Sequence, residues 1–385
     1  MKPLAQAAIN MPGSGIREIV HLAMTMPDVI RLEVGEPNFP TPTHIVEAAY
    51  QAANSGFTKY GPSGGLHSLR ELLAQRVSRV NGYPVSATQI NVSVGGVQGV
   101  HAAFSALLDP GDEVLIPDPA WPNYEMAILL RGAVPVHYPL YIKHGFVPRP
   151  EDIEGLITNR TKLVIINSPS NPTGAVFPRE TIEALVALAQ RHDLYLMSDE
   201  VYDELTFEGE HVSPALYDAE RTIGIYAFSK NYAMTGWRIG YVVANEELAK
   251  VITKIQEPMI SCVASPVQKA AEAALTGPQD CIRQMRDSYR ERRDAVVELL
   301  KEEGYYVYTP RGAFYIMVDI SESGVDSRQF AFNLLETCRV AVAPGTAFGD
   351  LGGDFVRISL ATEKGLLLEG VRRLCEFMKE GQARQ

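Results

Sequence analysis

Residues 162–199 read KLVIINSPSNPTGAVFPRETIEALVALAQRHDLYLMSD, and this stretch decides the fold. Its two short runs, KLVIIN and LYLMSD, are apolar on both faces, which is typical of strands that helices cover on each side. The segment between them, from Arg179 to His192, reads as a helix. A strand, a helix and a second strand in this order predict one unit of a mostly parallel sheet in an α/β domain.

The same alternation continues before and after this unit. We expect further strands at INVSV (90–94), EVLIPD (113–118), AVPVHYPL (133–140), TIGIYAF (222–228) and IGYVVA (239–244). We expect helices at Gly96–Leu108 and near Tyr124–Arg131, and upstream a helix that Thr41 caps, that begins at Pro42 and that ends near Asn54. The strands add up to a seven-stranded sheet between layers of helices.

A smaller α+β domain is expected after this sheet. From about Cys281 a long charged helix leads into the short strands AFYIMVDI (313–320), RVAVAPG (339–345) and FVRISLA (355–361). We predict a large domain over residues 46–280 and a small domain formed by residues 1–45 and 281–385.

Composition narrows the class of protein. The 385 residues are 46% hydrophobic and 21% charged, as in an ordinary soluble globular chain. A net charge of -11 without a basic block argues against nucleic acid as a partner. Four scattered cysteines favour neither a disulfide framework nor a metal site, and no apolar run approaches the length of a membrane span. We expect a cytoplasmic protein with a small-molecule partner.

Ligands of such sheets bind beyond the carboxyl ends of the strands, so polar residues there are the first candidates for function. Asp199 ends LYLMSD, and a buried carboxylate at that place needs a cation or a proton. Tyr202 follows one turn later, and Asn171 lies in SPSNPTG after KLVIIN. Each has an ordinary alternative: Asp199 caps a helix, Tyr202 packs in the core, and Asn171 belongs to a turn.

Two further segments carry candidate residues for binding. In SVGGVQG the free amides near Gly96 and Val97 would begin a helix and suit a phosphate, although such a turn is often only a turn. Arg357 lies in the apolar strand FVRISLA and needs a carboxylate, which could belong to a ligand or to an internal salt bridge. Trp121 could stack on a ring or pack in the core.

The segment YAFSKNYAMTGWRIG (226–240) presents Ser229 and Lys230 where a strand ends, and Arg238 eight residues after the lysine. With it, nine segments occur in the order found in class I and II aminotransferases, which the chain resembles over nearly its whole length. They are LEVGEPNFPTP, KYGPSGG, SVGGVQG, DPGDEVLIPDPAWPNY, NSPSNPTGAVF, SDEVYDEL, AFSKNYAMTGWRIGY, GAFYIM and FVRISLA. The resemblance implies fold type I, the cofactor pyridoxal 5'-phosphate (PLP) and a homodimer with shared active sites.

The resemblance also implies roles for single residues. Lys230 would hold PLP as a Schiff base and act as the catalytic base, Asp199 would pair with the pyridine nitrogen, and Trp121 would stack on the ring. Tyr202 and Asn171 would bind the phenolic oxygen. The phosphate would be bound by the following residues: Gly96, Val97, Ser229, Arg238 and, from the other subunit, Tyr60. The substrate carboxylate would be bound by Arg357, Asn171 and the Gly35 main chain.

The implied activity is transfer of an amino group from an L-amino acid to a 2-oxo acid in a ping-pong cycle. Some relatives that accept acidic substrates have a lysine at the position of Val97. Ile16 lies in MPGSGIREI, which resembles the mobile N-terminal segment of the family. Together with Val97 and Tyr315, Ile16 favours neutral or aromatic side chains, although Arg17 could meet an acidic group.

Three other functions compete with this one. A PLP-dependent carbon–sulfur β-lyase would use the same lysine, aspartate and arginine. A regulatory protein with an aminotransferase-like domain would need a DNA-binding region, for which we expect no room in MKPLAQAAIN. A nicotinamide-dependent oxidoreductase would need a dinucleotide fingerprint after its first strand, and the sequence has none.

Overall fold

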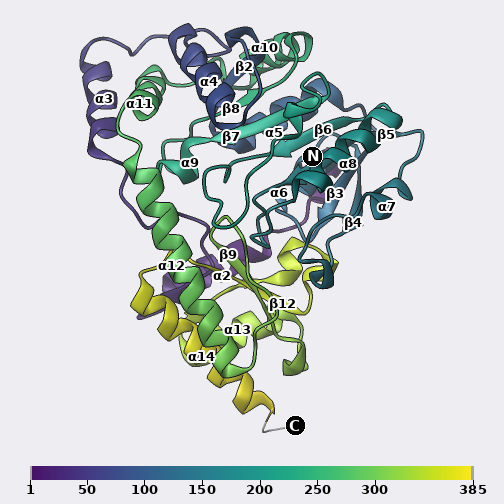
Figure 1. Ribbon diagram of the computed structural model, residues 1–385, viewed down its shortest axis with the longest axis vertical. Helices are drawn as coiled ribbons and strands as arrows, with labels where there is room; N and C mark the ends of the chain where they lie inside the picture. The colour runs from purple at the N-terminus through teal and green to yellow at the C-terminus, as the bar shows by residue number, and fades with distance from the viewer. Residues whose placement is uncertain (1, 383–385) are drawn as a thin grey trace.

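The computed structural model describes residues 2–382. Its main sheet has seven strands in the order β2-β8-β7-β6-β5-β3-β4 (Figure 1). They are β2 (Ile90–Ser93), β3 (Glu113–Asp118), β4 (Val134–Pro139), β5 (Thr161–Asn167), β6 (Tyr195–Asp199), β7 (Thr222–Ala227) and β8 (Gly240–Val243). Only β8 pairs antiparallel with its neighbours, β2 and β7. The prediction of a mostly parallel seven-stranded sheet is confirmed.

Helices cover both faces of this sheet because successive residues of each strand point to opposite sides. In β5, Leu163 and Ile165 pack in one core with α5 (Gly95–Leu107), α6 (Asn123–Leu129) and α10 (Glu246–Ile260). Val164 and Ile166 pack in another core, with α8 (Arg179–Arg191). At the other end of the sheet, α4 (His67–Val80) and α11 (Ser265–Thr276) share a core with β2, β7 and β8. The strands are therefore fixed by packing on both sides.

A second group of elements packs beside the main sheet. It contains a three-stranded antiparallel sheet, β11-β12-β9, made of β9 (Tyr315–Asp319), β11 (Ala343–Pro344) and β12 (Phe355–Ser359). A two-stranded sheet pairs β1 (Ile30–Arg31) with β10 (Val340–Ala341), so the N-terminal segment joins this group. The helices are α2 (Gly15–Thr25), α12 (Asp280–Glu303), α13 (Ser327–Cys338) and α14 (Lys364–Gln382).

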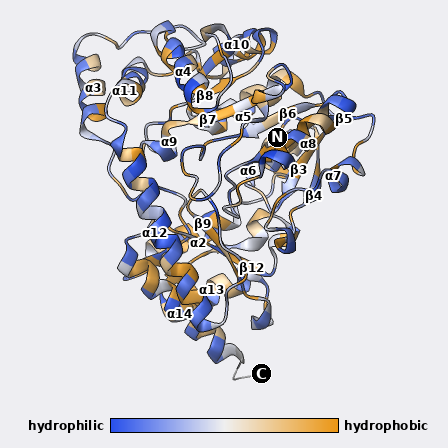
Figure 2. Cartoon of the chain, viewed as in Figure 1, coloured by the Kyte–Doolittle hydropathy of each residue, from blue (hydrophilic) through white to orange (hydrophobic). Residues whose placement is uncertain are grey.

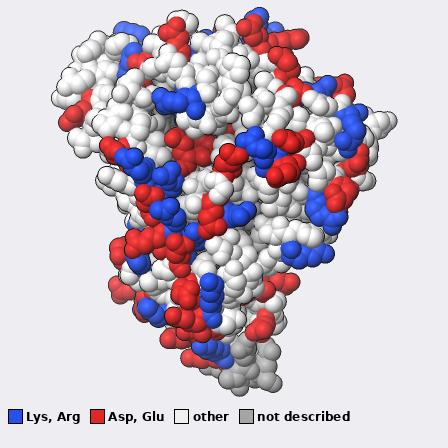
Figure 3. All heavy atoms as spheres, viewed as in Figure 1, with Lys and Arg blue, Asp and Glu red and all other residues white. Residues whose placement is uncertain are grey.

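The long helix α12 leads from the main sheet to this second group (Figure 1). Figure 2 shows hydrophobic segments where α13 and α14 lie near β9 and β12. On the face drawn in Figure 3, acidic and basic side chains alternate along α12 and α14. Ion pairs link the two helices, with Lys364 Nζ 2.7 Å from Glu291 Oε1 and Lys379 paired with Glu303.

The division into domains at residues 45/46 and 280/281 stays a prediction.

The remaining helices are α1 (Gln6–Ile9), α3 (Thr43–Asn54), α7 (Pro150–Glu154) and α9 (Phe228–Asn231). Short 3-10 turns occur at Ala87–Gln89, Ile142–His144, Pro214–Leu216, Ser321–Ser323, Gly345–Phe348 and Asp350–Gly352. No helix among residues 2–382 combines the length and the apolarity that a membrane crossing requires.

The structure corrects one predicted helix start. Thr41 was predicted to cap a helix beginning at Pro42, but α3 begins at Thr43 and receives no side-chain cap. The hydroxyl of Thr41 instead donates a hydrogen bond to Ala233 O at 2.6 Å and accepts one from Trp237 Nε1 at 3.1 Å. The threonine therefore ties the N-terminal segment to the loop after Lys230. The predicted helices near α5 and α6 are present, with ends shifted by one or two residues.

Candidate active site

A cavity of about 620 Å³ lies between the carboxyl ends of the central strands and the smaller sheet. That volume lies within the usual range for sites that bind small molecules. The structure brings together in its wall all but one of the residues singled out from the sequence: Ile16, Gly35, Gly96, Val97, Trp121, Asn171, Asp199, Tyr202, Ser229, Lys230, Arg238 and Arg357. Tyr60 is the exception, because it is 90% exposed and does not line this cavity.

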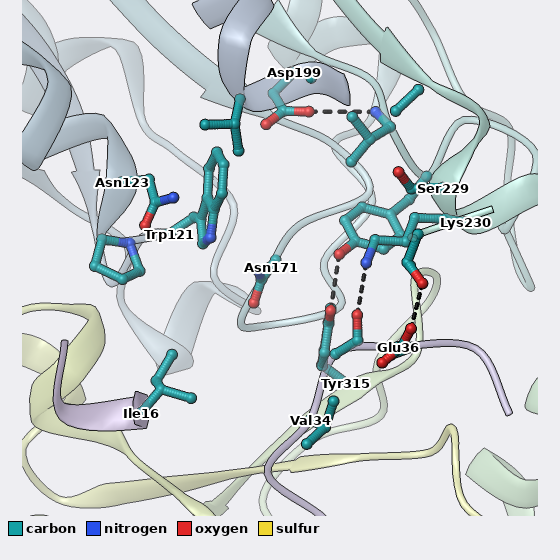
Figure 4. Close-up of a pocket in the computed structure, with 18 of the residues that line it drawn as sticks. Ile16, Val34, Glu36, Trp121, Asn123, Asn171, Asp199, Ser229, Lys230 and Tyr315 are labelled. Carbon is teal, nitrogen blue, oxygen red and sulfur yellow. Dashed lines mark hydrogen bonds between the residues drawn. The ribbon is translucent and has the colours of Figure 1, made fainter. Parts of the chain in front are cut away.

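Lys230 reaches into the cavity from α9, directly after β7 (Figure 4). Its Nζ donates a hydrogen bond to the main-chain oxygen of Gly35 at 2.6 Å. The side chain is exposed only in part, and desolvation around the amine lowers its pKa from 10.5 to about 8, although nearby Glu36 opposes this shift. A neutral carbonyl thus fixes the amine without forming an ion pair, and the amine loses its proton at a lower pH than an ordinary lysine does.

Asp199 ends β6, the strand next to β7 in the sheet, and it lines the cavity from there. The hydroxyl of Tyr124 donates a hydrogen bond to one carboxylate oxygen, and Val201 N donates to the other at 3.3 Å. Burial raises the pKa of the carboxyl to about 6. The helix-cap alternative is wrong, because residues 201–204 form a turn and not a helix. Within residues 2–382, no cation forms a salt bridge with Asp199.

Two tyrosines meet beneath Lys230. Tyr202 OH and Tyr315 OH are 2.8 Å apart, and both side chains are buried. Lys230 Nζ lies 5.9 Å from the centre of the Tyr202 ring. Tyr202 therefore presents a hydroxyl to the cavity as well as packing in the core.

Arg357 is 3% exposed, and its guanidinium points at neutral groups. Its Nη1 donates to Asn171 Oδ1 at 2.9 Å, its Nη2 donates to Glu33 O, and its Nε has no partner among the described residues. The internal salt bridge considered from the sequence is not formed within residues 2–382. The guanidinium also lies over the rings of Tyr315 and Phe348, with Cζ 4.4 and 4.8 Å from their centroids. A buried cation with only neutral partners retains the capacity to bind a carboxylate.

Asn171 belongs to the loop after β5, where its N–H donates to Asn167 Oδ1 at 2.7 Å. Its side-chain oxygen is the acceptor for Arg357, so its amide nitrogen is left to face a ligand. The turn alternative therefore holds for its backbone, while its side chain belongs to the site.

A group of hydrogen-bond donors, which we call the cradle, lies at the start of α5: Gly96, Val97, Ser229 and Arg238. Gly95 has a φ of +69°, and a Cβ there would lie 2.4 Å from Arg238 Nη2. Only glycine therefore allows this arginine to approach the helix end. The first amides of α5, at Gly96 and Val97, line the cavity together with Ser229 and Arg238. Amides at a helix N-terminus, one hydroxyl and one guanidinium form a set of donors suited to a phosphate.

Trp121 forms the wall opposite Lys230, as Figure 4 shows. Its ring packs edge to face on Tyr124, with centroids 5.3 Å apart and planes at 88°. Sequence reasoning missed Tyr124 as a site residue, although it is the partner of Asp199. The available signal was a tyrosine only three residues after Trp121, at the start of α6.

Glu36 and Thr235 were also missed. The Thr235 hydroxyl donates a hydrogen bond to Glu36, and both residues line the cavity. Glu36 lies near Lys230 (Figure 4). This contact joins the N-terminal segment to the loop after α9. No local pattern indicates a pair 199 residues apart in sequence.

Comparisons with known proteins agree with this geometry. The family model of aminotransferase class I and II matches residues 27–374. The chain is 39% identical over 383 residues to an aspartate aminotransferase of Pyrococcus horikoshii, covering 98% of both chains. It is 40% identical over 381 residues to an aspartate/prephenate aminotransferase of Thermus thermophilus, covering 98% of this chain and 97% of the relative.

A solved structure of the aspartate aminotransferase of Thermus thermophilus with maleate has a TM-score of 0.94 to this chain. The match extends over 98% of this chain and 100% of that one, at 39% identity. The fold type I architecture expected from the sequence is confirmed by this likeness. The chain belongs to the class I and II aminotransferases, enzymes that transfer amino groups by PLP chemistry.

Proposed function

We propose that transamination takes place in this cavity, with Lys230 as the residue that carries PLP and moves the proton. The observation that supports this most directly is a lysine amine of lowered pKa, held by a neutral oxygen 2.6 Å away. An amine in this state can act both as a nucleophile and as a base near neutral pH.

The residues of the cavity fit PLP group by group. Asp199, which has no cation partner within the described chain, would pair with the pyridine nitrogen, and Trp121 would cover one face of the ring. Tyr202 and Asn171 would bind the phenolic oxygen. The phosphate would be held by the amides and side chains of the cradle: Gly96, Val97, Ser229 and Arg238. The exposed Tyr60 would add a contact from the second subunit of a homodimer.

When bound, PLP supplies an electron-accepting ring that stabilises the charge left when the α-C–H bond of an amino acid breaks. The chain supplies the rest. Arg357, Asn171 and the main chain of Gly35 would bind the α-carboxylate and so fix the direction of the C–H bond. The Lys230 amine would accept the proton and later return it. Asp199 would remain charged beside the ring and keep the ring electron-poor.

The side-chain part of the cavity favours neutral or aromatic substrates. Ile16, Val97 and Tyr315 line it, together with Trp121. Some relatives that accept acidic substrates have a lysine in place of Val97. Arg17 lines the mouth and is exposed, and it forms no salt bridge with other residues between 2 and 382. An acidic side chain would therefore find a cation only at the solvent edge, where an ion pair contributes little.

The direct test of this function is Lys230→Ala. We expect the variant to lose transamination and to lose the cofactor that borohydride fixes on the chain, because no other amine replaces Nζ. Absorbance and peptide mass spectrometry measure both effects. Lys254→Ala, at an exposed lysine of α10, is the matched control and should retain both properties. A fully active Lys230→Ala enzyme would contradict the proposal.

Asp199→Asn should change the stability of the apoenzyme and its affinity for PLP in opposite directions. The folded pKa of Asp199 is raised above its ordinary 3.8, so the folded state disfavours the charged form, and the penalty develops as the pH rises from about 4 to about 6. At pH 7.5 the neutral asparagine should therefore stabilise the apoenzyme by on the order of 2–3 kcal/mol.

The same variant should bind PLP more weakly, because it lacks the charge that pairs with the pyridine nitrogen. Chemical denaturation of the apoenzyme measures the gain in stability, and titration with PLP measures the loss in affinity. A less stable apoenzyme with unchanged affinity for PLP would show that Asp199 has a purely structural role.

Val97→Lys tests the substrate preference. The new amine would lie in the side-chain part of the cavity, so kcat/KM for aspartate should rise by about tenfold, which corresponds to about 1.4 kcal/mol. The value for leucine or phenylalanine should fall. Val97→Met is the control for added length without charge. A wild-type enzyme that already prefers aspartate to both neutral substrates would contradict the predicted preference.

A further inference from the structure

A cluster of buried polar side chains lies behind the cavity and takes no part in its wall. We call it the back network, and its members are Arg76, Asn81, Glu200, Asp203, His211 and Asn231. Each of these side chains is at most 6% exposed. None of them lines the 620 Å³ cavity. Three of them, however, directly follow residues that do: Glu200 follows Asp199, Asp203 follows Tyr202, and Asn231 follows Lys230.

Arg76 of α4 is the centre of the back network. Its Nη2 donates to both oxygens of Asp203, at 3.0 and 2.9 Å, and to Glu204 Oε2 at 2.7 Å. Its Nη1 donates to Tyr241 OH at 3.0 Å. Helix α4 thereby holds the turn that carries Tyr202. The contact is an ion pair between Arg76 and Asp203, whose side chains are 5% and 1% exposed.

Asn231 connects this centre to the lysine. It is the last residue of α9, and its Nδ2 donates to Asp203 Oδ1 at 2.8 Å. The four-residue helix that carries Lys230 is too short to hold its own orientation. The contact with Asp203 thus fixes the α9 backbone to the turn after β6.

Glu200 connects the same network to the aspartate. Its carboxylate accepts four hydrogen bonds from side chains of three segments: Asn81 Nδ2 at 3.0 Å, His211 Nε2 at 2.8 Å, Ser213 Oγ at 2.7 Å and Tyr226 OH at 3.0 Å. Burial lowers the pKa of the His211 imidazole, but the nearby Glu200 carboxylate outweighs this effect and raises the pKa overall. The side chain behind Asp199 is therefore saturated with donors.

We propose that the back network is a positioning device that holds Lys230, Tyr202 and Asp199 in fixed relation to one another. The inference rests on the proposed function. Stability alone does not account for the network, because apolar residues of similar volume often replace buried ion pairs at no cost in stability. A role in positioning accounts for the network, because reacting groups must be held within a fraction of an ångström of their working geometry.

Asn231→Ala is the test, because it removes the link to Lys230 without touching the cavity. We expect kcat to fall by about 10- to 100-fold with KM for the amino acid unchanged. In the holoenzyme, we also expect a shift in the pH midpoint of the visible absorption band, because Lys230 would no longer be held in one orientation. Spectrophotometric titration measures this shift independently of turnover.

Asn91→Ala is the matched control. Asn91 is 1% exposed, lies in the same large sheet and donates a side-chain hydrogen bond to Thr253, which is not a member of the back network. The Asn91→Ala variant should be less stable than the wild-type enzyme, as Asn231→Ala should be. It should nevertheless keep the wild-type kcat and absorption midpoint. A second variant, Arg76→Lys, retains the charge and loses the planar fork. It should change kcat and the midpoint in the same direction.

Folded Asn231→Ala or Arg76→Lys enzyme with wild-type kcat and an unshifted midpoint would overturn the inference. An equal change of kcat and midpoint in Asn91→Ala would also overturn it, because the effect would then come from a general loss of stability. These results leave the proposed function intact, whereas an active Lys230→Ala enzyme would overturn the proposed function itself.

Discussion

The site depends on keeping two opposite charges close to one cavity without letting them neutralise each other. Lys230 is held by the carbonyl of Gly35, and Asp199 is held by the hydroxyl of Tyr124 and by a main-chain amide. Because these partners are neutral, each ionisable group keeps its capacity to bind a ligand of opposite charge or to exchange a proton. A direct ion pair between them would remove both capacities, and burial raises the free energy of each charged form until a ligand arrives.

The fold supplies this arrangement through the direction of its strands. β5, β6 and β7 are parallel, so their carboxyl ends place Asn171, Asp199 and Lys230 at one edge of the sheet. The smaller sheet brings Arg357 and Tyr315 to the other side of the same cavity. The cores on both faces of the main sheet hold the strand ends in place, and their apolar burial offsets the unfavourable burial of the charges.

Much of this could be predicted from the sequence. Several of the strands are apolar on both faces, so their ends could be predicted, and the polar residues after the ends of β5, β6 and β7 marked the cavity. Contacts between distant residues could not be predicted in the same way. Tyr124 bonds to a residue 75 positions away, and Arg76 bonds to one 127 positions away. Local patterns do not indicate such pairs, because only the packed fold brings them together. The start of α3 was wrong for the same reason, since the hydroxyl of Thr41 binds Ala233 and does not cap its own helix.

The central claim is that burial prepares the amine of Lys230 for reaction before any ligand binds. The most direct measurement is the rate at which the apoenzyme attaches PLP covalently, followed by absorbance as a function of pH. Attack requires the neutral amine, which forms above the pKa. We therefore expect the rate to rise with pH, with a midpoint at about pH 8. A midpoint near 10.5, the ordinary value for a lysine, would contradict it.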